Sequence, residues 1–205
     1  MSEEQFTPHI LRDRDGEEGV AERLTQWWAR LQGADDIEEP PFPSGTLAVL
    51  KRATGPDDAL LSEGFRRLWF ALPPGRRNSW EMRAWGGVAV LLANVKHQDS
   101  DRLFAAAMAE ERQSSSGSGS GKPVVSELRF RQLLHSRDLD EFVRRARRAV
   151  HLIDQRVDVR SLADDLLLWH REKNGRFTAR PDHRLAVRWA DAYFTRLARY
   201  EKAQR

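Results

Sequence analysis

Apolar side chains recur three or four residues apart along most of the chain, which is the spacing that predicts amphipathic helices. The first such stripe combines Val20, Leu24 and Leu31 with the adjacent pair Trp27 and Trp28, and a glycine follows it as a helix stop. A convincing alternation of apolar and polar residues, which would predict a half-buried strand, is not found. The pattern therefore predicts an all-α fold.

Two short helical segments are expected after the first helix. The earlier one would be capped by Ser44 and would carry Lys51 and Arg52 at its end. Residues 55–57, Gly-Pro-Asp, form a second start signal, because proline is well tolerated in the first turn of a helix. The two basic residues would then lie at the junction between these helices.

Longer stripes follow in the first half of the chain. One runs over 61–72 and stops at the Pro-Pro-Gly of 73–75. The next is expected over 79–97, and its middle is apolar all round, so it should form the buried centre of a bundle. The glycine pair at 86–87 would let a neighbouring helix approach closely, at some loss of helix stability. A further helix is expected around 103–108.

A Ser/Gly-rich stretch divides the chain. Residues 113–122 have the sequence QSSSGSGSGK, a composition typical of a flexible linker. Four more helical patterns follow, at roughly 125–135, 138–155, 158–173 and 181–203. We therefore expect two helical-bundle subdomains, residues 1–111 and 125–205, joined by a linker loop at 112–124.

The helix expected over 138–155 has one apolar face and one positive face. At about 100° per residue, one arc of about 120° holds Leu139, Phe142, Val143, Ala146, Ala149, Val150 and Ile153, while Arg144, Arg145, Arg147, Arg148 and His151 fill the opposite side. From Arg144 to Arg148 the rise is about 6 Å at ~1.5 Å per residue. That is on the order of two phosphate steps of ~3.4 Å along a strand. The spacing predicts a helix that lies against a nucleic-acid backbone.

A merely solvated helix face is the alternative interpretation of these arginines. Solvated faces usually mix charges of both signs, because like charges at i, i+4 repel. Only Glu141 and Asp154 flank this cluster, so the repulsion is expected to stay uncompensated. Arginine also suits bidentate phosphate contacts better than lysine does. The pattern therefore favours nucleic-acid binding.

Composition and charge support that interpretation. The 205 residues include seven Trp and are 40% hydrophobic, enough for a substantial core. Residues 1–121 carry 14 Lys and Arg against 19 Asp and Glu, a net of −5, whereas residues 122–205 carry 20 against 12, a net of +8. Because the positive charge is concentrated in the C-terminal part, we expect that part to meet the anionic partner.

The chain is expected to be a soluble, cytoplasmic protein. It contains no Cys, which excludes disulfides, a thiolate zinc site and a cysteine nucleophile and is compatible with a reducing compartment. The acidic start shows no apolar signal-peptide segment. The most apolar run, 84–93, spans ten residues, about half of the ~20 needed to cross a bilayer.

Several segments resemble one known family in their order along the chain. They are WARL at 28–31, LKRAT at 50–54, SELRFRQLL at 126–134, the arginine-rich helix, RVDVRSLADDLLLW at 156–169 and RWADAYF at 188–194. In this succession the chain resembles the CasB family, the small subunits of the type I-E Cascade CRISPR surveillance complex. The resemblance is strongest over 126–194 and moderate over 20–111.

The resemblance implies an all-helical, non-catalytic subunit that needs no cofactor and takes part in antiviral defence. Its implied partners are the backbone subunit CasC, the large subunit CasA, the guide crRNA, the target and displaced DNA strands, and a second copy of the chain. Its implied work is to stabilise the R-loop through backbone contacts. This agrees with the residues themselves, because guide pairing reads the sequence in such complexes while protein contacts the backbone.

Candidate nucleic-acid-binding residues follow from the matching motifs. The resemblance carries this role to Arg52 in LKRAT, Arg129 in SELRFRQLL, and Arg147 and Arg148 in the arginine-rich helix, with Arg77 after the Pro-Pro-Gly turn. The neighbouring basic residues Lys51, Arg131, Arg144 and Arg145 complete the candidate set.

The chain departs from the family in two places. Near Arg102 it has SDRLFAAAMA without the family's usual Gly-Arg helix start, and it inserts KNGRFTARPDH at 173–183 between the last two helices. The family's nucleic-acid contacts are therefore not carried over to either segment.

Other chemistries find no support in the sequence. The six His are scattered, and no pair has the i, i+4 spacing with a carboxylate between that a metalloprotease helix requires. Asp164 and Asp165 are adjacent, so on a helix they point in different directions and are expected on a solvated face or beside arginines. The Gly/Ser run at 117–121 lacks the ending of a phosphate-binding loop. Neither a metal site nor an enzyme is predicted.

Two other binding functions stay open. The segment 126–148 could form a helix-turn-helix of a DNA-binding regulator, although residues 139–142 are poor base readers. The arginines could instead pair with acidic protein partners in a scaffold. The aromatic residues on the apolar stripes, Trp27, Trp28, Trp69, Trp85, Trp169 and Trp189, are expected in the core rather than stacked on bases.

Overall fold

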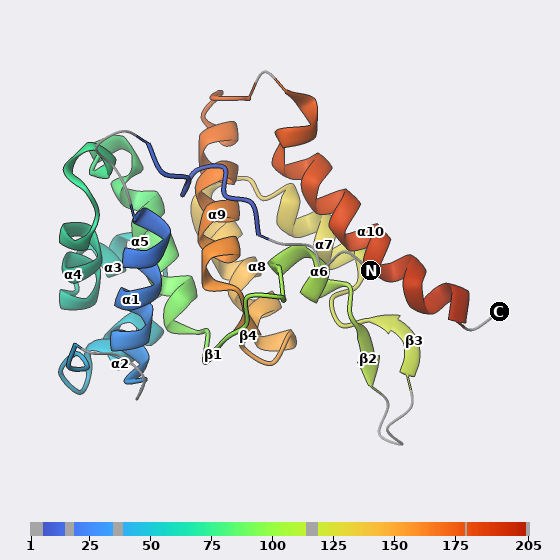
Figure 1. Cartoon of the computed structure of the whole chain (residues 1–205), viewed down its shortest axis with the longest axis horizontal. Coiled ribbons are helices and arrows are strands. Elements are labelled where there is room, and N and C mark those ends of the chain that lie inside the picture. Colours follow the sequence, from blue (N-terminus) through green and yellow to red (C-terminus); the bar gives the residue numbers. More distant parts are fainter. Residues whose placement is uncertain (1–5, 15–18, 35–38, 114–118, 179, 204–205) are drawn as a thin grey trace.

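The computed structural model describes residues 6–14, 19–34, 39–113, 119–178 and 180–203. Within these ranges the chain is mostly helical, with ten α-helices, two 3₁₀ turns and four short strands (Figure 1). The helices are α1 (Val20–Gln32), α2 (Thr46–Arg52), α3 (Pro56–Leu60), α4 (Glu63–Ala71), α5 (Ser79–Ala93), α6 (Phe104–Met108), α7 (Glu127–Leu134), α8 (Leu139–Leu152), α9 (Val159–Lys173) and α10 (Leu185–Ala203). The 3₁₀ turns are η1 (Pro74–Arg76) and η2 (Pro181–His183), and the strands are β1 (His97–Gln98), β2 (Glu111–Gln113), β3 (Gly119–Pro123) and β4 (Arg156–Val157).

The helical stripes predicted from the sequence form helices, and their ends follow local chemistry. Helix α1 ends where Gly33 adopts a left-handed φ of 71° and its N–H bonds the Ala29 carbonyl. The Ser62 side chain accepts a hydrogen bond of 3.1 Å from Phe65 N and thereby caps α4. This cap excludes Leu61 from the helix, and its side chain is 93% exposed, so the expectation that Leu61 begins the apolar stripe was wrong.

Two other predicted helix ends were wrong as well. The short helix begins at Thr46 with Gly45 at the N-cap, so Ser44 is not the capping residue. The long buried helix ends at Ala93 rather than His97, because Asn94 closes it with its N–H on the Leu91 carbonyl at 2.9 Å. The chain then leaves the helix to form β1.

Helix α5 is the buried centre of the fold, as its all-round apolar composition predicts. It packs against α3, α8 and α9. A Cβ at Gly86 would lie 2.8 Å from the Pro56 carbonyl oxygen, and one at Gly87 would lie 3.0 Å from Val143 Cγ2. The glycine pair therefore allows α3 and α8 to approach α5 more closely than any side chain would permit.

The four short strands correct the expectation of a purely helical chain. Strands β1 and β4 pair in parallel, with His97 opposite Arg156. Strands β2 and β3 form an antiparallel pair. Of the linker loop expected at 112–124, residues 112–113 belong to β2 and 119–123 form β3, while 114–118 lie outside the described residues.

The core is one continuous cluster of buried apolar residues that draws on helices from both halves of the chain. It includes all six tryptophans expected there, Trp27, Trp28, Trp69, Trp85, Trp169 and Trp189, which are 2 to 8% exposed. Their core assignment is confirmed. The division into two subdomains stays a prediction.

The N-terminal segment 6–14 passes across α9 without forming secondary structure (Figure 1). The buried Asp164 carboxylate accepts hydrogen bonds from the backbone N–H groups of His9, Ile10 and Leu11 at 2.7 to 3.1 Å. Both Asp164 and its neighbour Asp165 are buried and lie 3.7 Å from the Arg188 guanidinium. The expectation of a solvated face was wrong, and that of arginine partners is confirmed.

Candidate nucleic-acid interface

Helices α7 and α8 carry most of the predicted site residues. The Asp138 side chain caps α8 by accepting a hydrogen bond of 2.8 Å from Glu141 N. All seven residues of the predicted apolar arc are buried. Because that arc packs inward, the arginines of α8 are held on its outer side.

A groove of about 560 Å³ lies between these two helices. Its basic lining residues are Arg129 of α7 and Arg144, Arg145, Arg148 and His151 of α8. Arg129 and Arg148 are exposed, and neither side chain forms an ion pair or hydrogen bond with any residue the structure describes. Their N–H donors are thus available to an anion in the groove.

Buried Glu141 corrects the prediction that the repulsion among the arginines is uncompensated. Its carboxylate lies 3.0 Å from Arg145, 3.7 Å from Arg144 and 3.3 Å from Arg137. Hydrogen bonds from the backbone and side chain of Arg137 hold the pKa of the Glu141 carboxyl below its ordinary value. Glu141 lies one turn before the arginines at i+3 and i+4, a local arrangement that neutralises part of their charge.

Arg147 points into the protein rather than into the groove. Its guanidinium donates to the Ala53 carbonyl at 3.1 Å and to the Lys51 carbonyl, at the C-terminal end of α2. Burial lowers the pKa of this guanidinium. Arg147 therefore joins α8 to α2, a function that its position on the positive face of α8 did not predict.

The other candidate residues lie outside the groove. Lys51 and Arg52 occupy the end of α2, next to the carbonyls that Arg147 holds. Arg131 lies 3.8 Å from Glu127 on α7. Arg77 follows η1, where its guanidinium covers the Phe70 ring at 5.6 Å. The structure thus gathers four of the nine candidates, Arg129, Arg144, Arg145 and Arg148, into one groove.

Arg102 has a structural role. It pairs with Glu110 and donates to the Ile153 and Arg156 carbonyls at 2.9 and 2.8 Å, beyond the end of α8. These bonds tie Arg102 to the turn between α8 and β4.

The groove also contains residues that the site prediction left out. Gln132 lines it, and its carbonyl accepts a hydrogen bond from Arg145. His151 follows Arg148 by three residues and extends the basic lining by one turn. The i, i+3 spacing of His151 from Arg148 was visible in the sequence, whereas the approach of Gln132 depends on how α7 packs against α8.

The helix-turn-helix alternative finds little support in this geometry. Helices α7 and α8 are joined by four residues, as such a motif requires. However, Leu139, Glu141 and Phe142 at the start of α8 are buried, and Asp140 pairs with Arg83 at 2.6 Å. A recognition helix reads bases with its N-terminal residues, and these positions are already occupied by contacts within the protein.

The described residues form neither a metal-binding cluster nor a membrane-spanning helix. In the described part of the chain, His, Asp and Glu residues form no group of three or more that could hold a metal ion. None of the helices formed by the described residues has the length and apolar character needed to span a membrane.

The chain is similar to known proteins in both sequence and fold. Residues 46–194 match the family model described as CRISPR-associated protein Cse2. CasB from Thermus thermophilus shares 27% identity, with a TM-score of 0.53 over 85% of this chain and 97% of that one. A second structure, of a CRISPR-associated protein of the Cse2 family from Thermus thermophilus, shares 26% identity, with a TM-score of 0.54 over the same fractions. Comparison with curated protein sequences gives no match.

The family match covers most of the chain and includes both helices of the groove. The two similar structures extend the agreement to the fold. The resemblance found in the sequence motifs is thereby confirmed: the chain belongs to the Cse2/CasB family of CRISPR-associated proteins.

Proposed function

We propose that this chain is the small, non-catalytic subunit of a type I-E Cascade complex and that it stabilises the R-loop by binding nucleic-acid backbone in the groove between α7 and α8. The observation that carries the proposal is the set of exposed guanidinium groups of Arg129, Arg144 and Arg148 in that groove. Membership of the Cse2/CasB family supports a place in such a complex.

The groove suits a phosphate backbone better than a base. Its polar side chains are mainly cationic donors, and arginine binds phosphate oxygens through two parallel N–H donors. Backbone binding positions a strand without reading its sequence. This matches a complex in which the guide RNA supplies sequence specificity.

The arginines of the groove differ in how many of their N–H donors are already bound within the protein. Arg148 and Arg129 keep their donors free of the described residues, Arg144 lies 3.7 Å from Glu141, and Arg145 is held by both Glu141 and Gln132. We assign the main phosphate contacts to the first three and a positioning role to Arg145. Lys51 and Arg52, at the end of α2, would extend the path of the strand.

The test uses Arg129→Ala combined with Arg148→Ala in complexes assembled with the other Cascade subunits and guide RNA. Its matched control is Arg66→Ala combined with Arg199→Ala, which removes the same charge from two exposed helical positions outside the groove. We expect the double variant to co-purify normally and to bind target DNA with about tenfold lower affinity, a loss of about 1.4 kcal/mol in binding free energy. The control should keep the affinity of the unchanged complex.

The salt dependence gives a second measurement. For the isolated chain on single-stranded DNA, the slope of log affinity against log salt should fall by about 0.7 for each phosphate contact removed. Unchanged DNA affinity with lost co-purification would instead identify the groove as a site for acidic protein partners. Equal affinity and equal slopes in the test and control variants would contradict the proposal.

A further inference from the structure

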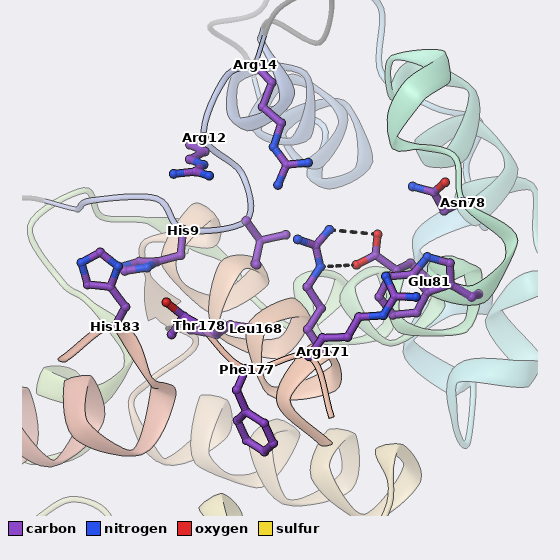
Figure 2. Close-up of a pocket in the computed structure, with 13 residues that line it drawn as sticks. His9, Arg12, Arg14, Asn78, Glu81, Leu168, Arg171, Phe177, Thr178 and His183 are labelled. Carbon is purple, nitrogen blue, oxygen red and sulfur yellow. Dashed lines mark hydrogen bonds and ion pairs between the residues drawn. The ribbon is translucent and has the colours of Figure 1, made fainter. Parts of the chain in front are cut away.

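A second basic pocket, of about 460 Å³, lies at another place on the molecule and shares no lining residue with the groove (Figure 2). It lies among the N-terminal segment, the start of α5, the end of α9 and the loop between α9 and α10. Four arginines line it, Arg12, Arg14, Arg171 and Arg176, against a single carboxylate among the described lining residues, Glu81.

The carboxylate does not cancel the charge of the pocket. Arg171 binds Glu81 through two hydrogen bonds of 2.6 and 3.1 Å, and this pair forms one wall (Figure 2). Arg12 and Arg14 are exposed, and their side chains form no ion pair or hydrogen bond with the described residues. In Figure 2, Arg14 extends from the N-terminal segment toward the Arg171–Glu81 pair. The pocket therefore keeps a net positive charge.

Buried charged residues hold the backbone of residues 9–12, which leads into the segment that carries Arg12 and Arg14. Asp164 holds the N–H groups of residues 9–11, and buried Arg76 donates to the carbonyls of Ile10 at 2.6 Å and Arg12 at 2.5 Å. An irregular segment normally keeps much of its conformational freedom. Here the backbone of residues 9–12 is already restrained before any ligand arrives, which reduces the entropy lost on binding.

The loop after α9 supplies further hydrogen-bond donors to the pocket. The Arg176 guanidinium lies 3.8 Å from the centre of the Trp80 ring, a cation–π contact that leaves its N–H donors unbonded to the described residues. Thr178 adds a hydroxyl group. Burial lowers the pKa of His9 to about 4, and the positive charges of Arg188 and Arg12 act in the same direction.

Two segments that the motif resemblance does not cover contribute basic residues to the pocket. Arg12 and Arg14 precede the matched residues 46–194. Arg176 and Thr178 belong to the segment 173–183, which the motif comparison identified as an insertion. The pocket shares no lining residue with the groove between α7 and α8, so the role assigned to the groove does not account for it.

We propose that this pocket binds the phosphate group of a nucleotide, either free or within a nucleic-acid strand. Planar guanidinium groups from separate segments converge there, and they are suited to phosphate oxygens. The volume of about 460 Å³ exceeds that of a lone phosphate and lies within the ~300 to 1,000 Å³ range of small-ligand sites. The inference goes beyond the proposed function and does not depend on it.

The experiment titrates the full chain with four probes: inorganic phosphate, deoxythymidine 5′-monophosphate, thymidine and a short oligothymidylate. Binding is measured by calorimetry for the unchanged chain and for Arg12→Ala combined with Arg14→Ala. The matched control is again Arg66→Ala combined with Arg199→Ala. Each titration is repeated in the Arg129→Ala, Arg148→Ala background, so that loss of the groove and loss of the pocket are measured separately.

We expect at least one phosphate-bearing probe to bind at least tenfold more weakly to the Arg12, Arg14 variant, in both backgrounds, with an unchanged melting temperature. The control should stay within twofold, and thymidine should not bind. Monophosphate binding would identify a free nucleotide, whereas binding of the oligomer alone would identify a strand. Equal affinities in the variant and its control for every phosphate-bearing probe, or equal binding of thymidine, would overturn the proposal.

Discussion

Adjacent arginines on α8 should respond to substitution in opposite ways, and Arg147 gives the sharper test. Arg147→Ala removes the two hydrogen bonds that its guanidinium donates to the Lys51 and Ala53 carbonyls. Hydrogen bonds to a charged group contribute about 1.5 to 3 kcal/mol each. Partial exposure lets water replace some of what is lost, so we expect a decrease of about 2 kcal/mol in the free energy of unfolding.

The assay is thermal and urea unfolding beside DNA binding. For a chain of this size, a loss of about 2 kcal/mol corresponds to a decrease of about 4 to 8 °C in melting temperature. Arg148→Ala is the control, since Arg148 is exposed and forms no contact of this kind with the described residues. It should stay within about 0.5 kcal/mol of the unchanged chain.

DNA binding should show the reverse order. Arg148→Ala should lower the slope of log affinity against log salt by about 0.7 on single strands, whereas Arg147→Ala should leave that slope unchanged. An Arg147→Ala chain that melts normally and loses the same slope would refute the reasoning. It would mean that Arg147 leaves α2 to contact phosphate.

Three other changes test further parts of the structure. Trp169→Ala should lower the free energy of unfolding by about 3 to 5 kcal/mol, measured by urea unfolding, because the ring is buried; normal melting with weaker DNA binding would contradict its core role. Burial raises the pKa of Asp165 to about 7. The folded state therefore holds a proton that the unfolded state releases near pH ~4, and stability falls as pH rises between these values. Asp165→Asn should therefore make the free energy of unfolding less dependent on pH, by up to about 1.4 kcal/mol per pH unit, as measured by urea unfolding at about pH 5 and pH 7. The same pH dependence in the variant and the unchanged chain would contradict this. Glu141→Gln should strengthen single-strand DNA binding and steepen its salt dependence, since it frees Arg144 and Arg145; weaker binding at equal melting temperature would contradict this.

The helices and the core were predictable because their signals are local. The ~3.6-residue period of the apolar positions identifies the buried side of each helix from a few turns of sequence. This holds for the buried arc of α8 and for the glycine pair of α5, where the all-round apolar composition already indicates close neighbours. Strands β1 and β4 have two residues each, too few for any alternation to show.

The site was predictable only in part, because the direction of a long side chain depends on distant partners. The partner of Arg147 lies 94 to 96 residues earlier in the chain, and no local pattern distinguishes Arg147 from Arg148. The burial of Glu141 likewise depends on how α8 packs. The pocket around Arg14 joins segments more than 150 residues apart, so neither segment alone indicates a site.

The protein contacts of each arginine determine how much of its charge remains for a strand. A guanidinium has five N–H donors in one plane, and each donor bound by the protein is lost to phosphate. By this measure Arg148 and Arg129 keep their donors unbound by any residue that the structure describes, Arg144 lies 3.7 Å from Glu141, and Arg145 is bound by Glu141 and Gln132. Arg147 is committed to α2, where it keeps Lys51 and Arg52 beside α8. Under the proposed function, the positive face of α8 would therefore have two roles: Arg147 anchors the helix to α2, and the arginines whose donors the described residues leave free would bind phosphate.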